Sequence, residues 1–189
     1  MILVPSDPIQ TKPLMIRRSA PLLAFVVLCG GLTPTGAASA AALSLETFFQ
    51  GRLTAVGTLE NFREKAKRDF TIAMQASWSG KTGTLVEEVA FADGERQHKV
   101  WTFDKIGAGR FIGHREDLTR EAEVSEDSAG VHMTYKARTR VPSGDTFNLA
   151  FDDHLSPAGP NAVAVRSDIS YFFIPAAQVT MTITKMGSK

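Results

Sequence analysis

Apolar and polar residues alternate with a period of two through most of the chain after residue 53, and this pattern constrains the fold more than any other feature. In the clearest segment the apolar positions are Phe70, Ile72, Met74, Ala76 and Trp78. Successive side chains of a β-strand point to opposite faces, so alternation of this kind predicts strands with one buried face. The chain is therefore expected to be all-β.

The alternating segments follow one another at the spacing of an up-and-down β meander. Asp93-Gly94 is a strong hairpin signal, and 142–145 is a second turn sequence. An open sheet of this size has unpaired edges, whereas closure removes them. We expect an antiparallel up-and-down β-barrel or half-barrel of about 8–10 strands. A short N-terminal helix over 43–50, capped by Ser44, would lie against one opening.

Residues 1–40 have the organisation of a cleavable signal peptide. The basic pair Arg17-Arg18 precedes an apolar core over 21–29, and the small residues Ala-Ser-Ala at 38–40 match a typical cleavage site. We expect cleavage at this site, followed by one domain in the periplasm or outside the cell.

The mature chain would then begin near Ala41 and form a single domain over 41–189, with translation possible from Met15. A transmembrane anchor is less favoured, because the apolar stretch falls short of the roughly 20 residues that span a bilayer. A lipid anchor on Cys29 is also less favoured, because a bulky leucine precedes that cysteine. No membrane span is expected after processing.

Composition excludes several classes of function for the mature chain. Cys29 is the single cysteine, so cleavage after residue 40 removes disulfides, thiol catalysis and cysteine-based metal sites. The net charge is +1, and residues 1–40 hold three basic residues against one acidic residue. The remaining domain is close to neutral, which gives no electrostatic reason to expect nucleic acid or an anionic membrane surface as a partner.

Several sequence runs together resemble a known family. They are LETFFQGRLTAVGTL at 45–59, LVEEVAFADGE at 85–95, KVW at 99–101, FNLAFDDHL at 147–155 and FFIPAAQVTM at 172–181. The chain resembles DUF3833, a bacterial family of lipocalin-like envelope proteins that are often lipoproteins. This resemblance implies a small β-barrel in the cell envelope, connected with lipids, and it supplies no known activity.

The family pattern implies an acidic position at Glu87, an aromatic position at Trp101 and paired acids at Asp152 and Asp153. The sequence departs from the pattern at Lys99, where an arginine is expected.

Motifs for common chemistries are missing from the sequence. The histidines are His98, His114, His132 and His154, and no two of them are spaced along a strand or helix as metal ligands. We expect them to face solvent and expect no metal. There is no G-x-S-x-G sequence and no phosphate-binding glycine loop, so no catalytic residue and no cofactor is expected.

Charged residues on the apolar phase are a more informative signal. They are Glu87, Arg115, Asp117 and Asp153. If these side chains point inward they need partners, because an unpaired buried ion is costly. Three interpretations stay open. Glu87 or Asp153 pairs with Arg115, the charges orient a ligand headgroup, or they lie at strand ends where the barrel opens to water.

Aromatic residues share the inward phase and complete the candidate binding site. They are Trp78, Phe91, Trp101, Phe103, Tyr135 and Phe151. They either line an apolar pocket or fill the core, since small barrels can be filled by side chains alone.

The leading interpretation is a non-enzymatic protein that binds or carries an apolar or lipid-like small molecule in the cell envelope. One alternative is an enzyme or accessory factor of envelope lipid modification, with Glu87 or Asp153 as general acid or base. The other is a structural or assembly factor with a filled barrel.

Overall fold

The computed structural model describes residues 43–141 and 144–187; the predicted signal peptide, Met15 and Cys29 lie outside these ranges. The described residues form one short helix and ten strands. Their bounds are α1 Leu45–Phe48, β1 Gly51–Asn61, β2 Ala66–Ser79, β3 Thr82–Phe91, β4 Arg96–Gly107, β5 Arg110–His114, β6 Leu118–Glu126, β7 Val131–Arg140, β8 Thr146–Gly159, β9 Ala162–Tyr171 and β10 Ile174–Lys185. Within the described ranges, no helix has the length and apolar character needed to cross a membrane.

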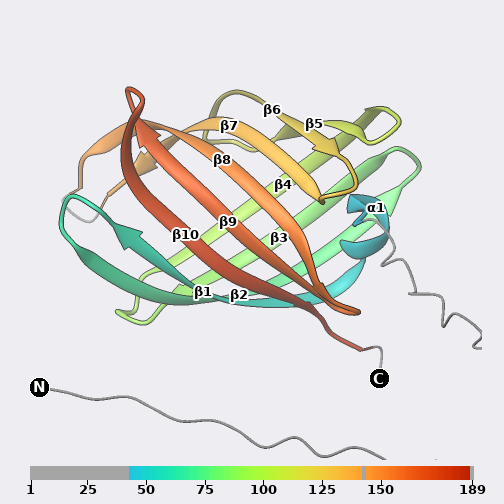
Figure 1. Ribbon diagram of the computed structural model, residues 1–189, viewed down its shortest axis with the longest axis horizontal. Coiled ribbons are helices and arrows are strands. Elements are labelled where there is room, and N and C mark those ends of the chain that lie inside the picture. Colours follow the sequence, from blue (N-terminus) through green and yellow to red (C-terminus); the bar gives the residue numbers. More distant parts are fainter. Residues whose placement is uncertain (1–42, 142–143, 188–189) are drawn as a thin grey trace, which may run out of the picture. The chain divides into compact units, whose positions relative to one another are not determined.

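The ten strands form a closed antiparallel barrel in which each strand pairs with its neighbours along the chain (Figure 1). The first and last strands close the ring. Their register runs from Leu53 opposite Lys185 to Asn61 opposite Ala177. The predicted antiparallel barrel is therefore confirmed, and it is a full barrel because β1 and β10 are paired over this whole length.

The alternation in β2 becomes an inner and an outer face of the barrel wall. Phe70, Ile72, Met74 and Ala76 are buried, whereas the residues between them are exposed. Full burial of one large apolar side chain stabilises the folded state by about 1.5–3 kcal/mol. Residues of the same phase in the other strands form the rest of the inner wall. The alternation therefore determines which side chains point into the barrel.

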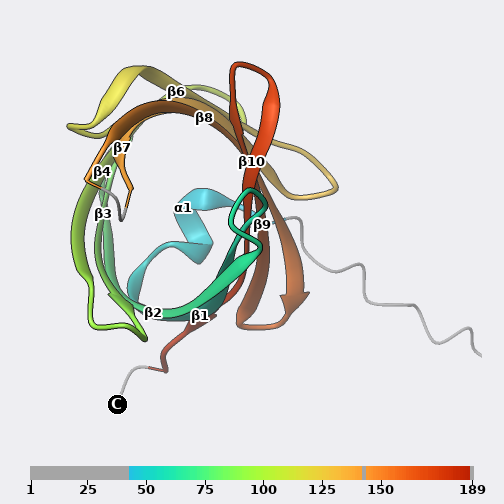
Figure 2. The same cartoon turned by 90° about the vertical axis from the view of Figure 1, so that its left-hand side faces the viewer.

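The short helix α1 lies across one end of the barrel and is seen through the ring of strands in Figure 2. It is shorter than the predicted 43–50. Ser44 is the N-cap residue, as predicted, but its side chain makes no capping hydrogen bond. Contacts with the strands hold it instead. The indole Nε1 of Trp78 donates to the carbonyl of Phe49 at 3.0 Å, and the backbone amide of Leu45 donates to Glu126 at 2.5 Å.

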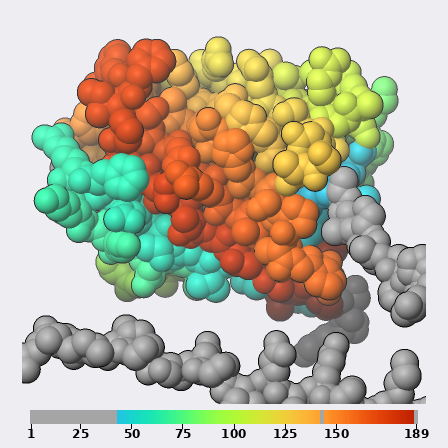
Figure 3. Space-filling view, in the orientation of Figure 1, coloured from blue at the N-terminus to red at the C-terminus, as the bar shows by residue number. Residues whose placement is uncertain are grey.

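The β9–β10 hairpin projects at the other end of the barrel, at the upper left of Figure 3. Its two turn residues, Phe172 and Phe173, have positive φ angles of 46° and 66°. Their side chains are 76% and 95% exposed. Left-handed backbone is costly for bulky residues, so this turn is strained as well as apolar.

Candidate functional site: the barrel interior

The barrel encloses a cavity of about 1430 Å³. Its lining begins beside α1, with Leu45 and Phe49, and extends to the opposite mouth, with Asn61, Arg138 and Tyr171. The sequence left open whether side chains fill the barrel. This continuous space along the barrel shows that they do not, so the interpretation of a filled barrel is wrong.

All ten residues predicted for the binding site line this cavity. They are Trp78, Glu87, Phe91, Trp101, Phe103, Arg115, Asp117, Tyr135, Phe151 and Asp153. They come from β2, β3, β4, β7, β8 and the connection between β5 and β6. The inward direction inferred from the alternation is thus observed, while a role in binding a ligand stays a prediction.

A connected group of aromatic rings forms one side of the cavity. Trp101 stacks on Phe103, with ring centroids 5.5 Å apart and 12° between the planes. The edge of Tyr135 meets Trp101 at 5.2 Å, and Tyr135 in turn stacks on Phe151 at 4.6 Å. Such contacts add to the apolar burial and fix the orientation of each ring. The result is a preformed aromatic surface.

Arg115 lies against this aromatic surface just after the end of β5. Its guanidinium carbon is 4.3 Å from the centroid of the Trp101 ring, and its side chain is 5% exposed. Asp117 accepts two hydrogen bonds from it, at 2.5 and 3.0 Å. The direct ion pair of Arg115 is thus with Asp117 rather than with Glu87 or Asp153, although its charge still acts on both of these carboxyl groups. Asp117, two residues along the same connection, reaches the guanidinium in a bidentate geometry.

Glu87 lies near the middle of β3, directly opposite Lys99 on β4. Burial raises the pKa of the Glu87 carboxyl, while the positive charges of Lys99 and Arg115 oppose that rise. Burial also lowers the pKa of Lys99, and the nearby Arg115 lowers it further. Each side chain thus gives up hydration and depends on its neighbours to remain charged.

Asp153 lies near the middle of β8 and is 7% exposed. Burial raises its pKa to about 6, although hydrogen bonding by Ser167 and Tyr135 opposes the rise. Its Oδ1 atom has no hydrogen-bond partner among the described residues. An unsatisfied oxygen in a buried position is rare in folded proteins, and here it lies in the wall of a cavity.

The binding site predicted from the sequence did not include two polar residues of this cluster. Lys99 and Ser167 both line the cavity, and Ser167 is directly opposite Asp153 on β9. The interpretation that the charges lie at strand ends is wrong for Glu87 and Asp153, which are in mid-strand. Arg115 and Asp117 do lie between two strands, but the Arg115 side chain is buried against Trp101 rather than open to water.

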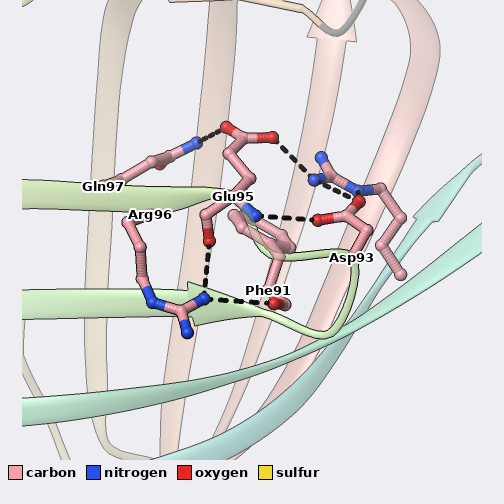
Figure 4. Close-up of polar contacts among 6 residues, drawn as sticks. Phe91, Asp93, Glu95, Arg96 and Gln97 are labelled. Atoms are coloured by element: carbon pink, nitrogen blue, oxygen red, sulfur yellow. Dashed lines mark hydrogen bonds and ion pairs between the residues drawn. The ribbon is translucent and has the colours of Figure 1, made fainter.

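The mouth of the cavity is held by polar contacts around the β3–β4 turn (Figure 4). Arg68 on β2 donates to Asp93 at 2.7 Å and to Glu95 at 2.6 Å. Gln97 donates to the other oxygen of Glu95 at 2.7 Å. The guanidinium of Arg68 also lies 4.1 Å from the ring centroid of Phe91. These contacts tie three neighbouring strands together, so this side of the mouth is preformed.

The family described as a protein of unknown function (DUF3833) matches residues 25–185 of the sequence. The chain belongs to this family. The match covers α1 and all ten strands, and thus every residue of the DUF3833 barrel that lines the cavity. No curated protein matches the sequence.

Two solved structures are similar to this DUF3833 protein. The S-type phycobiliprotein lyase CPES from Guillardia theta has a TM-score of 0.57 at 12% identity, over 78% of this chain and 95% of that chain. EF1p2_mFAP2b, solved bound to DFHBI, has a TM-score of 0.39 at 14% identity, over 74% of this chain and 95% of that chain. The first likeness is one of fold, and it agrees with the predicted lipocalin-like barrel.

Proposed function

We propose that this DUF3833 protein binds a small amphipathic, lipid-like molecule inside its barrel. The observation that carries the proposal is the cavity of about 1430 Å³, with an aromatic wall and buried charged groups. Small-molecule pockets typically measure about 300–1,000 Å³. The chamber therefore has room for an elongated ligand that extends from α1 toward the mouth.

The chemistry of the wall indicates the polarity of the ligand. The rings of Trp101 and Phe103 offer contact to an apolar portion. The unpartnered Oδ1 of Asp153 can accept a hydrogen bond from a ligand donor, and Lys99 can donate to a ligand acceptor. A pure hydrocarbon would leave these polar groups unsatisfied at a cost. An amphipathic molecule, with its polar group at the charged cluster, satisfies them.

The place of action that we propose is the cell envelope. Support comes from the signal-peptide pattern of residues 1–40. The intact mass of the protein isolated from the periplasm should correspond to a chain beginning near Ala41. A diacylated chain beginning at Cys29, or an uncleaved chain in the membrane, would contradict this.

Native mass spectrometry of the protein purified from its own envelope tests the binding proposal. The wild-type protein should retain a small apolar molecule, and Trp101→Ala should retain much less because the variant lacks a central part of the wall. Phe111→Ala is the matched control, since Phe111 is 1% exposed and is not among the lining residues. It should lose about 3–5 kcal/mol of stability, while the folded fraction retains the ligand.

A second pair of variants tests the charged cluster. Arg115→Met deletes the charge but keeps a long apolar stem, so it should weaken retention of a ligand with an anionic group. Arg120→Met, at a side chain that is 64% exposed, should leave retention unchanged. The binding proposal fails if the wild-type protein carries no small molecule, or if Phe111→Ala reduces retention as much as Trp101→Ala.

Asp153 favours a second candidate function, an enzyme or accessory factor of envelope lipid modification. A buried carboxyl group with a pKa of about 6 and a free oxygen at a cavity wall suits a general acid or base. In that case Asp153→Asn should still bind the lipid but leave it chemically unchanged. Mass spectrometry should compare the lipids of cells that make the wild-type protein with those of cells that make Asp153→Asn. If the two sets of lipids have identical masses, the enzyme proposal fails and the binding proposal remains.

A further inference from the structure

Two histidines and one aspartate converge on the outer wall of the barrel, on strands β7 and β8. His132 and His154 are direct cross-strand partners, and their imidazole rings stack with centroids 4.5 Å apart. Asp152 lies on the same face, two residues before His154. Its Oδ1 atom is 2.6 Å from Nε2 of His132 and 3.2 Å from Nε2 of His154.

The expectation of solvent-facing histidines is met here, since the His132 and His154 side chains are 44% and 58% exposed. The spacing rule applied to the sequence considers ligands on one strand or helix. It could not detect a pair that is 22 positions apart and joined only by the register of two strands. The three ligand atoms lie within 4.8 Å of one another.

These separations suit a first-row divalent transition ion. Zinc binds imidazole nitrogen and carboxylate oxygen at about 2.0–2.2 Å, so tetrahedral ligands are about 3.3 Å apart. The His154–Asp152 distance of 3.2 Å is close to that value, and the His132–Asp152 distance of 2.6 Å is shorter, so small side-chain rotations would open room for the ion. The backbone register between β7 and β8 is continuous, so the wall presents the ligands from a fixed frame.

We propose that His132, Asp152 and His154 form a binding site for Zn²⁺ or a similar divalent transition ion on the outside of the barrel. Two imidazoles and one carboxylate are ligands that such ions prefer, and a fourth position stays open to water. The site lies on the face of β8 opposite to Asp153, so it is separate from the cavity.

The charged groups around the site are compatible with a bound cation. Arg166 on β9 is the cross-strand partner of His154, but its guanidinium is engaged by Asp168 at 3.0 Å. Asp168 is itself the cross-strand partner of Asp152 and adds a negative charge beside the site. On the β6 side the partner of His132 is Ser125, which is small and uncharged.

Calorimetric titration with ZnCl₂ tests the site on the purified full chain, made without a histidine tag and first treated with a chelator. The wild-type protein should bind one ion per chain. His132→Gln and His154→Gln should each weaken binding at least about tenfold, because each removes a ligand. Cobalt(II) should give the visible absorption of a tetrahedral complex with the wild-type protein and lose it in both variants.

His98→Gln is the matched control, because His98 is also exposed on the outer wall and lies 2.5 Å from a carboxylate oxygen of Glu88. That variant should bind zinc as the wild-type protein does. Thermal unfolding without metal verifies that all three variants fold. Added zinc should raise the melting temperature of the wild-type protein and of His98→Gln, but not that of His132→Gln or His154→Gln. The proposal is overturned if binding is absent below millimolar zinc, or if His98→Gln weakens it as much as His132→Gln.

Discussion

The carboxyl group of Asp153 is held away from water with one oxygen unsatisfied, so ionising it costs more in the folded protein than in the unfolded chain. The folded protein consequently binds this proton more tightly. The contribution of Asp153 to stability is fully present below the pKa of an unfolded aspartate, about 3.9. It is lost as the pH rises through about 6.

Replacing Asp153 with asparagine should remove this pH dependence. The free energy of unfolding of the variant, relative to the wild-type protein, should rise by roughly 2–3 kcal/mol between pH 4 and pH 8. Urea unfolding at several pH values measures the difference. Asp69→Asn, at an exposed aspartate, is the control for removing one carboxyl group. A curve for Asp153→Asn parallel to that of the wild-type protein would contradict the burial of its charge.

Gly83 also shapes the cavity, because the absence of a side chain at this position leaves room for the ring of Trp78. A Cβ atom at this position would lie 2.6 Å from the ring of Trp78. Gly83→Ala should therefore displace the indole and weaken its hydrogen bond to Phe49, at a cost of about 1–3 kcal/mol. Chemical denaturation measures the loss. In a Trp78→Ala background the same substitution should cost little, and an equal cost in both backgrounds would place the clash elsewhere.

The sequence predicted the direction of single residues well, because alternation is a local property. The neighbours of Glu87 and Asp153 alone place both residues on the apolar phase of their strands. Lys99 shares the phase of Trp101 and could have been found by the same argument. Ser167 likewise shares the phase of Val165 and Ile169, although a small polar residue is a weaker signal because it occurs on either face. The partner of Arg115 could not be predicted, because it depends on the path of the β5–β6 connection.

The β9–β10 hairpin shows strain at the scale of one element. Tyr171 pairs with Ile174, so Phe172 and Phe173 form a two-residue turn with positive φ at both positions. Turns of this kind favour asparagine and glycine, since left-handed backbone costs other residues about 1–2 kcal/mol each. The hairpin is therefore less stable with Phe172 and Phe173 in the turn than it would be with asparagine or glycine at these positions.

Phe173→Gly should stabilise the protein by about 1 kcal/mol, because glycine adopts the positive φ without strain and the ring buries little surface. Urea unfolding at neutral pH measures the change. Ile174→Gly is the control, because this residue is 67% exposed but does not have a positive φ. It should be neutral or destabilising. Loss of stability in Phe173→Gly would mean that the phenyl ring makes contacts that outweigh the backbone strain.

The elements themselves were predictable to different degrees. The inner phase of β2 and the Asp93-Gly94 turn follow from residues a few positions apart. The helix was expected over 43–50 and spans four residues, and the hydrogen bonds that tie it to Trp78 and Glu126 depend on strands distant in the sequence. The register that closes β1 on β10 joins residues more than a hundred positions apart, and no local pattern encodes it.

At the scale of the whole molecule, closure gives each of the ten described strands a partner strand on both sides, although residues 96–101 of β4 pair only with β3. Partners that add a strand to an exposed sheet edge therefore find no complete strand edge on the described barrel wall. Contacts with other molecules have to be made by side chains, through the mouth of the cavity or on the outer faces of the strands.

Pairing of Leu53 with Lys185 also fixes an order of events during synthesis. The seam of the barrel cannot form on the ribosome until β10 has emerged, long after β1 was made. Until then β1 exposes one edge and its apolar face, which is the state most prone to aggregation. The newly made chain therefore passes through a period in which β1 and β10 have both been made but are not yet paired.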